Sequence, residues 1–167
     1  MTKMVVGPDA GLRPGVSPAI VPAGACAVPG VAQGALVLTL EGALPVEYLS
    51  PGDRVVTRAG ARRLLAVTPV EAEGEMVLIQ PGVLGHDRPG QALMLGAQTP
   101  VLLRDWRAQA LYGAAQALVP AGRLVDGEFV TRVCGRGLRL FALHFERPEV
   151  IYVDGVEIGT APLVVPA

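Results

Sequence analysis

The chain has 167 residues, of which 51% are hydrophobic, and its 14 basic and 15 acidic residues leave a net charge of −1. This length predicts one domain whose core needs no metal or disulfide, because a chain of about 150 residues buries about 70% of its unfolded surface. The charge balance provides no basic surface for nucleic acid or an anionic membrane, so we expect neither as a partner.

Residues 1–30 are rich in proline and glycine, which favour a flexible arm, and we expect the folded β domain to occupy residues 31–167. The N-terminal residues lack the continuous apolar segment of a signal peptide. Glycine, proline or a charge interrupts every apolar run before the ~20 residues of a membrane span. These features predict a cytoplasmic protein by default, with secretion that needs no N-terminal signal left open.

From residue 35 onward, short apolar runs alternate with turn signals that contain glycine or proline. Runs of this length, rich in β-branched residues, predict an all-β fold. The expected strands are Ala35–Leu40, Val55–Thr57, Met76–Ile79, Ala92–Leu95, Val101–Leu103, Phe129–Thr131, Leu138–Phe145 and Val150–Val153, the last closed by an Asp154-Gly155 turn. Only Pro45–Leu49 and Arg107–Leu118 have a helical composition, and no long amphipathic helix is expected.

An internal repeat is visible at an offset of about 75 residues. The two copies are LPVEYLSPGDRVVTRAGARRLL from Leu44 and VPAGRLVDGEFVTRVCGRGLRL from Val119. Pro45 aligns with Pro120, and Gly52 aligns with Gly127. Each copy predicts a short helical turn, a tight glycine turn, a strand and a return strand. Two such copies indicate two related halves around a pseudo-two-fold axis.

The run from Gly30 to Gly60, GVAQGALVLTLEGALPVEYLSPGDRVVTRAG, resembles the opening of bacterial hedgehog/intein (Hint) domains. The resemblance continues to the segment from Phe141 to Gly155, so that it covers about residues 30–160. It implies the Hint fold, an all-β fold of two pseudo-symmetric halves. In this family the first residue, a Cys or Ser, attacks its own preceding carbonyl, and a Thr/Ser-x-x-His element assists with hydrogen bonds and proton transfer.

Transferring these roles along the chain gives a degenerate site. The position of the nucleophile is Gly30, which has no side chain with which to attack. The hydroxyl and imidazole of the second element fall on Gly96 and Thr99, and Pro148 occupies a position where relatives commonly have histidine. The resemblance therefore implies a domain that does not cleave itself, and whether it is an enzyme at all is doubtful on these residues.

The remaining candidates for chemistry are few. Cys26 lies four residues before the expected nucleophile. The alternative hypothesis is that Cys26 acts as a displaced nucleophile. Cys134 is expected to be a small core or turn residue, and a disulfide between the two cysteines stays open. His144 is expected on the strand face opposite Leu143 and in a polar role rather than a catalytic one, and His86 is expected in an exposed loop.

The sequence predicts neither a metal nor a cofactor. A metal site needs three or four convergent ligands, and His86 beside Asp87 does not supply them. The glycine-rich stretches lack the strand–loop–helix context of phosphate sites. Trp106 is expected to anchor a loop onto the core. Arginines on the two repeats are expected to form a solvated face of ion pairs: Arg54, Arg58, Arg62, Arg63, Arg132, Arg136 and Arg139.

Two functions of different classes follow. The first is a structural or protein-binding module built on a degenerate Hint domain, with a protein as its expected partner. The second is a self-cleaving domain that releases an N-terminal fragment from near residue 30 by an unorthodox nucleophile. Protein splicing is disfavoured, because the chain carries no C-terminal His-Asn pair. An unrelated hydrolase would need a nucleophile–His–acid set that the two histidines do not visibly provide.

Overall fold

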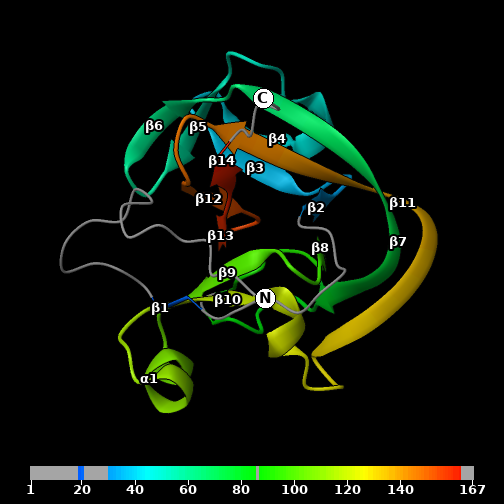
Figure 1. Ribbon diagram of the computed structural model, residues 1–167, viewed down its shortest axis with the longest axis vertical. Helices are drawn as coiled ribbons and strands as arrows, with labels where there is room; N and C mark the ends of the chain where they lie inside the picture. Colours follow the sequence, from blue (N-terminus) through cyan, green and yellow to red (C-terminus); the bar gives the residue numbers. More distant parts are fainter. Residues whose placement is uncertain (1–18, 21–29, 86, 163–167) are drawn as a thin grey trace, which may run out of the picture.

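A computed structural model describes residues 19–20, 30–85 and 87–162, and it contains two β-sheets (Figure 1). The first sheet has the order β1-β10-β9-β13-β12-β3-β5-β6, with β4 paired to β3. Its strands are β1 (Ala19–Ile20), β3 (Leu36–Thr39), β4 (Gly42–Pro45), β5 (Arg54–Thr57), β6 (Gly60–Arg63), β9 (Pro100–Leu103), β10 (Ala117–Pro120), β12 (Val150–Val153) and β13 (Val156–Gly159). The prediction of an all-β fold is confirmed.

The second sheet closes on itself. It has the order β14-β11-β2-β8-β7, and a further pairing of β11 with β7 closes these two strands, β2 and β8 into a ring, with β14 added at β11. Its strands are β2 (Val31–Ala32), β7 (Ala66–Ile79), β8 (Leu93–Gly96), β11 (Val130–Phe145) and β14 (Ala161–Pro162). The expected strands Phe129–Thr131 and Leu138–Phe145 fall on the single strand β11, apart from Phe129, which precedes it, and Met76–Ile79 is only the end of β7. The pairing of β11 with β7 continues through glycines in both strands. Its register shifts between Gly135 and Leu138, where the sequence predicted a break between two strands.

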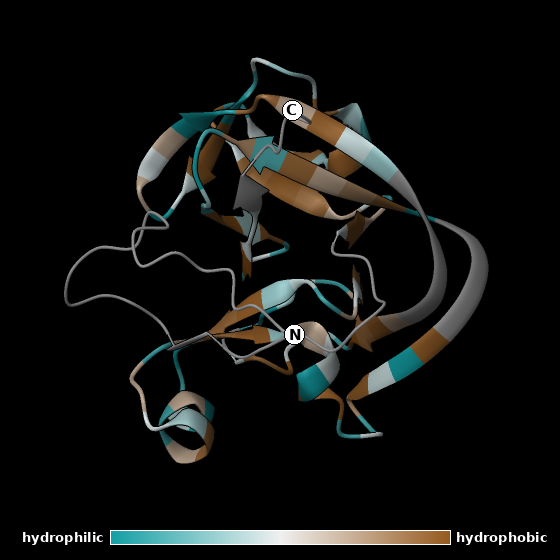
Figure 2. Cartoon of the chain, in the orientation of Figure 1, coloured by the Kyte–Doolittle hydropathy of each residue, from teal (hydrophilic) through white to brown (hydrophobic). Residues whose placement is uncertain are grey.

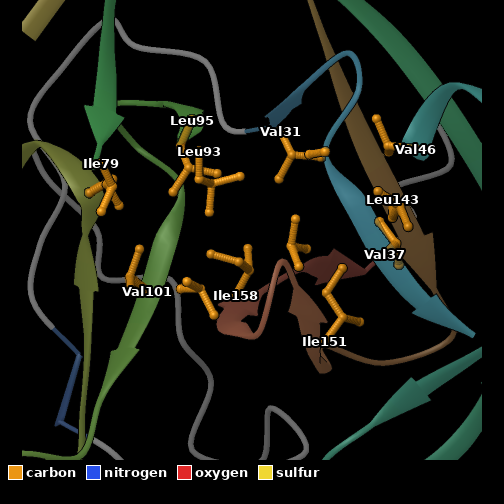
Figure 3. Packing of buried hydrophobic residues seen from close by; sticks show 14 of the residues in the cluster. Val31, Val37, Val46, Ile79, Leu93, Leu95, Val101, Leu143, Ile151 and Ile158 are labelled. Carbon is orange, nitrogen blue, oxygen red and sulfur yellow. The ribbon is translucent and has the colours of Figure 1, made fainter. Parts of the chain in front are cut away.

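The core lies between the inward faces of both sheets, because alternate residues of each strand point the same way. In β12, for example, Ile151 and Val153 are buried while their neighbours are partly exposed. Both belong to one apolar cluster, and Figure 3 shows Ile151 in it together with Val37 of β3 and with Leu93 and Leu95 of β8. A continuous apolar cluster of this kind is what holds the start of the domain, at β2, against the rest.

The internal repeat is visible in the backbone. Pro45 precedes the short 3₁₀ helix η1 (Val46–Tyr48) with φ −56° and ψ 139°, and Pro120 precedes η2 (Ala121–Leu124) with φ −56° and ψ 136°. Gly52 and Gly127 then turn the chain with positive φ angles of 99° and 83°. The predicted return strand forms only in the first copy, as β6. In the second copy the chain stays extended within β11, where it pairs with β7.

Turn and helix predictions have different outcomes. Asp154 and Gly155 join β12 to β13 with φ angles of 50° and 83°, which is the left-handed pair that a two-residue hairpin needs, so the predicted turn is confirmed. The predicted helix at Arg107–Leu118 is shorter, α1 (Trp106–Tyr112), because Gly113 ends it in a left-handed conformation and β10 begins at Ala117.

The prediction that Trp106 anchors a loop onto the core is wrong. Trp106 is the first residue of α1, and its side chain is 70% exposed. The helix is short and is buried at Ala108, and this leaves the indole side chain exposed to solvent. The guanidinium of Arg107 lies over the indole ring instead, 5.8 Å from its centre. Within the described ranges, no helix is both long and apolar enough to cross a membrane.

Candidate functional site at the start of the domain

Gly30 stands at the entrance to the domain, immediately before β2. Val31 of that short strand pairs with Phe141 of β11 on one side and with Leu95 of β8 on the other. Gly30 itself is buried and has a φ of 149°, an angle that residues with a side chain rarely adopt. A Cβ atom added here would lie 3.1 Å from both the Cβ of Leu140 and the carbonyl oxygen of Phe141. There is therefore little room for a side chain at Gly30, the position that the resemblance predicts for the family's nucleophile.

Thr99 holds Gly30 through two hydrogen bonds. The N–H of Gly30 donates to Thr99 Oγ1 at 2.9 Å, and the same hydroxyl donates to the Gly30 carbonyl at 2.9 Å. The N–H of Gly96 donates to that carbonyl as well, also at 2.9 Å. Thr99 is 2% exposed, so water does not compete for these bonds. The structure thus brings together three of the residues expected at the site: Gly30, Gly96 and Thr99. We refer to these three residues and their hydrogen bonds as the clamp.

The turn that presents Thr99 is fixed from both sides. It joins β8 to β9, and the N–H of Thr99 donates to the Gly96 carbonyl within it. From the second repeat, the N–H groups of Ala121 and Gly122 donate to the carbonyls of Thr99 and Ala97. The 3₁₀ helix η2 of one half therefore supports the turn that contacts the start of the other half.

The chemistry available to this arrangement is limited by its functional groups. The Thr99 hydroxyl accepts from the N–H of the peptide bond between residues 29 and 30, which the resemblance predicts to be the position of the cleaved bond in reactive family members. An imidazolium can hand a proton to a leaving amine, but a neutral threonine hydroxyl gives up its proton far too reluctantly to act as a general acid. The described groups can orient and hold this peptide bond. Gly30 and Gly96 have no side chain that could act as a nucleophile.

Thr99→Val is expected to lower the free energy of unfolding by about 1–3 kcal/mol, because it leaves the buried N–H of Gly30 without its acceptor. Valine keeps the β-branched shape, so the loss isolates the hydroxyl. Urea unfolding followed by circular dichroism measures the change. Thr99→Ser retains the hydroxyl and should recover most of the difference. If serine is as destabilising as valine, the methyl group rather than the hydrogen bonds stabilises this site.

The closing segment is arranged around another threonine. Glu149, next to Pro148, exchanges backbone hydrogen bonds with Thr160: its N–H donates to the Thr160 hydroxyl, and its carbonyl accepts from the Thr160 N–H. The Glu149 carboxylate lies 3.4 Å from Nε of Arg62. Pro148 is partly buried and carries no group that reaches the clamp around Gly30.

The other predicted candidates are placed as follows. Cys26 and His86 lie outside the described residues, and so does the side chain of Cys134. His144 lies on the face opposite the buried Leu143, as expected, and its Nε2 is 2.9 Å from the Thr68 hydroxyl. Among the described residues, no three His, Cys, Asp or Glu side chains are grouped so that they could hold a metal ion.

Sequence reasoning missed a buried carboxylate, that of Glu157 on β13. Its side chain is 2% exposed, and its carboxylate contacts Arg58 at 2.7 Å and Arg104, with Arg88 3.6 Å away. These arginines come from three separate parts of the chain. A signal was available, because Glu157 interrupts the apolar run Val156-Glu157-Ile158, and a charge there must have partners.

Asp154, in the turn of the same hairpin, is a second carboxyl in this region and is partly buried. Burial raises its pKa above the usual value, against the opposing effects of hydrogen bonds that involve Leu36 and Gln91. Gln91 Nε2 donates to Asp154 Oδ1 at 3.1 Å. The N–H of Gly90 donates to the carbonyl of Asp154. These bonds tie the loop before β8 to the hairpin.

Comparisons with solved structures place the fold. A bacterial intein-like domain from Clostridium thermocellum aligns with a TM-score of 0.57 at 15% identity, over 78% of this chain and 97% of that one. The gp41-1 intein aligns with a TM-score of 0.53 at 12% identity, over 80% and 98% of the two chains. The MchDnaB-1 intein gives 0.52 at 12% identity, over 78% and 98%. At these identities the likeness shows a shared fold.

A comparison with curated proteins gives no match for this sequence. The Hint domain family, by contrast, matches residues 29–162. That range begins one residue before Gly30 and ends with β14, so it includes both repeats and the whole of the clamp. The chain belongs to the Hint domain family.

Proposed function

We propose that this protein is a non-cleaving Hint domain that acts as a structural or protein-binding module. The observation that carries the proposal is the clamp at Gly30. A residue without a side chain occupies the position of the nucleophile, and its N–H is held by a threonine hydroxyl that cannot serve as a general acid at neutral pH.

The backbone supports the same proposal. In a cleaving domain the nucleophile must approach the preceding carbonyl, and the surrounding groups must polarise that bond. Here the carbonyl of Gly30 itself accepts hydrogen bonds from the Thr99 hydroxyl and the Gly96 N–H. They stabilise the start of β2 in its place within the closed second sheet. This arrangement favours a residue that anchors the chain over one that reacts.

Intact mass spectrometry of the purified chain tests the proposal. We expect the mass of the full 167 residues to persist for a day, with and without a strong thiol, because no thioester forms that the thiol could intercept. The rival function predicts loss of an N-terminal fragment that ends near residue 30, and faster loss with the thiol.

The variant Cys26→Ala separates the two functions further, because serine at this position could itself act as a nucleophile. A fragment that appears in the parent chain and is absent from Cys26→Ala would assign the cleavage to that cysteine and overturn the proposal. The same cleavage in both chains, with fragment masses that differ only by the substitution, would point to a different nucleophile and would overturn it as well. Full-length masses in all samples support a module that stays intact.

A further inference from the structure

The arginines around Glu157 carry more charge than that carboxylate neutralises. Arg58, Arg88 and Arg104 together bring three positive charges to one buried negative charge. The nearest acidic neighbour in sequence, Asp105, is engaged elsewhere, because it caps α1 at the N–H of Arg107 and lies 3.5 Å from the guanidinium of that residue. This excess is local, since the whole chain has a net charge of −1.

Two of these arginines have donors to spare. Arg88 uses its other nitrogens on the carbonyls of Gly85 and Leu84. Arg58 and Arg104 make no hydrogen bond or ion pair to a described residue other than Glu157, and their side chains are 29% and 46% exposed. A guanidinium presents five N–H donors in a planar fork that matches a carboxylate. These two forks therefore have unused donors in a partly exposed position.

Apolar surface adjoins this charge. Arg107 donates to the Val83 carbonyl at 3.4 Å while it covers the Trp106 ring, so it joins α1 to the loop that carries Leu84 and Arg88. That loop, Arg104 and Glu157 line one small pocket. Trp106 and Leu111 of α1 are exposed, and Figure 1 shows this helix projecting from the body of the domain. Figure 2 shows hydrophobic and hydrophilic segments side by side along it.

We propose that these residues form a docking surface for an acidic segment of a protein partner. The arginine–tryptophan surface consists of Arg58, Arg88, Arg104, Arg107 and Trp106. Carboxylates of the partner pair with the unused donors of Arg58 and Arg104, and an apolar side chain of the partner packs on Trp106. The inference rests on the proposed function as a protein-binding module, and it names the chemistry of the partner.

The composition favours a protein segment over a small anion or a nucleic acid. Tryptophan and arginine are the residues that most often carry the binding energy of protein interfaces. A small anion would use the guanidiniums but would leave Trp106 without a role. A nucleic acid usually binds to an extended basic surface, whereas this chain is slightly negative overall.

Fluorescence anisotropy with a labelled peptide of three Glu-Glu-Leu repeats tests the surface, and the full chain is the binder. We expect saturable binding below about 1 mM that weakens as salt is added, because exposed charges are screened. The matched peptide of Gln-Gln-Leu repeats should not bind. Arg104→Gln and Trp106→Ala should each weaken binding by about tenfold or more. Arg139→Gln, which removes an equal charge at an exposed position on β11, should change it by less than about twofold.

Three outcomes would overturn the docking surface. One is the absence of saturable binding at about 1 mM peptide. Another is an equal loss in Arg104→Gln and Arg139→Gln, which would assign the binding to overall charge. The third is full competition by inorganic phosphate with no effect of Trp106→Ala, which would indicate a small-anion site. Since the intact mass is measured on the same samples, a failure of this inference is distinguishable from a failure of the proposed non-cleaving state.

Discussion

Gly30→Cys should lower the free energy of unfolding by about 2–6 kcal/mol, and it should not produce a cleaving protein. Two costs add. A side chain at a φ of 149° strains the backbone by about 1–3 kcal/mol. A Cβ at 3.1 Å from Leu140 and from the Phe141 carbonyl forces a shift in a packed strand, at about another 1–3 kcal/mol. Urea unfolding followed by far-ultraviolet circular dichroism measures the loss of stability, and intact mass spectrometry shows whether the chain is cleaved.

The matched control for Gly30→Cys is Gly42→Cys. Gly42 also has a positive φ, 111°, but a Cβ built there meets nothing within 4 Å. This variant should therefore show only the backbone strain of about 1–3 kcal/mol. Equal losses of stability at the two positions would mean that the contact with β11 adds no cost. The clamp would then have enough room for the side chain of a nucleophile. An N-terminal fragment released by Gly30→Cys would show that only the side chain was missing.

Phe145→Ala is expected to cost about 3–5 kcal/mol, which is a large share of the roughly 5–15 kcal/mol that stabilises a typical domain. Phe145 ends β11, is 1% exposed and belongs to the main apolar cluster. Because strands hold its surroundings on both sides, the backbone cannot collapse into the space that the ring leaves. Far-ultraviolet circular dichroism is the suitable probe, since the chain's single tryptophan is exposed and would report little about the core.

Phe129→Ala provides the comparison for this prediction. The Phe129 side chain is 51% exposed, so its removal should change the free energy of unfolding by less than about 1 kcal/mol. A similar loss in both variants would mean that Phe145 does not contribute more than an average apolar residue. That result would contradict the assignment of the end of β11 to the core.

Local patterns in the sequence predicted the strands well wherever a strand is short. Val150–Val153 and its Asp154-Gly155 turn are found as expected, because alternation and left-handed turn residues act within a few positions. The repeat was also readable, since equivalent prolines and glycines impose the same backbone angles in both halves. The position predicted for the site came from the order of motifs that resemble a Hint domain, and its degenerate state stays a prediction.

Features that depend on distant partners were not readable. Nothing near Gly135 indicates that β11 continues through it, because the pairing that keeps the chain extended comes from β7. Trp106 looks like a core residue by its type, and only the shortness and position of α1 leave it exposed. The charge of Glu157 within an apolar run indicated that it needs partners, but the three arginines that supply them could not be identified, because they lie at residues 58, 88 and 104.

The sequence by itself therefore determined the fold class, the two related halves, and the residue types at Gly30, Gly96 and Thr99. Each of these is encoded locally, in periodicity, turn chemistry or the identity of a side chain. Only the tertiary structure decided that Thr99 clamps Gly30 and that Glu157 gathers its arginines. The groups in the clamp lie 69 residues apart, and those of Arg58 and Glu157 lie 99 apart. Such contacts form because strand pairing and core burial bring these positions together, and no local preference encodes that.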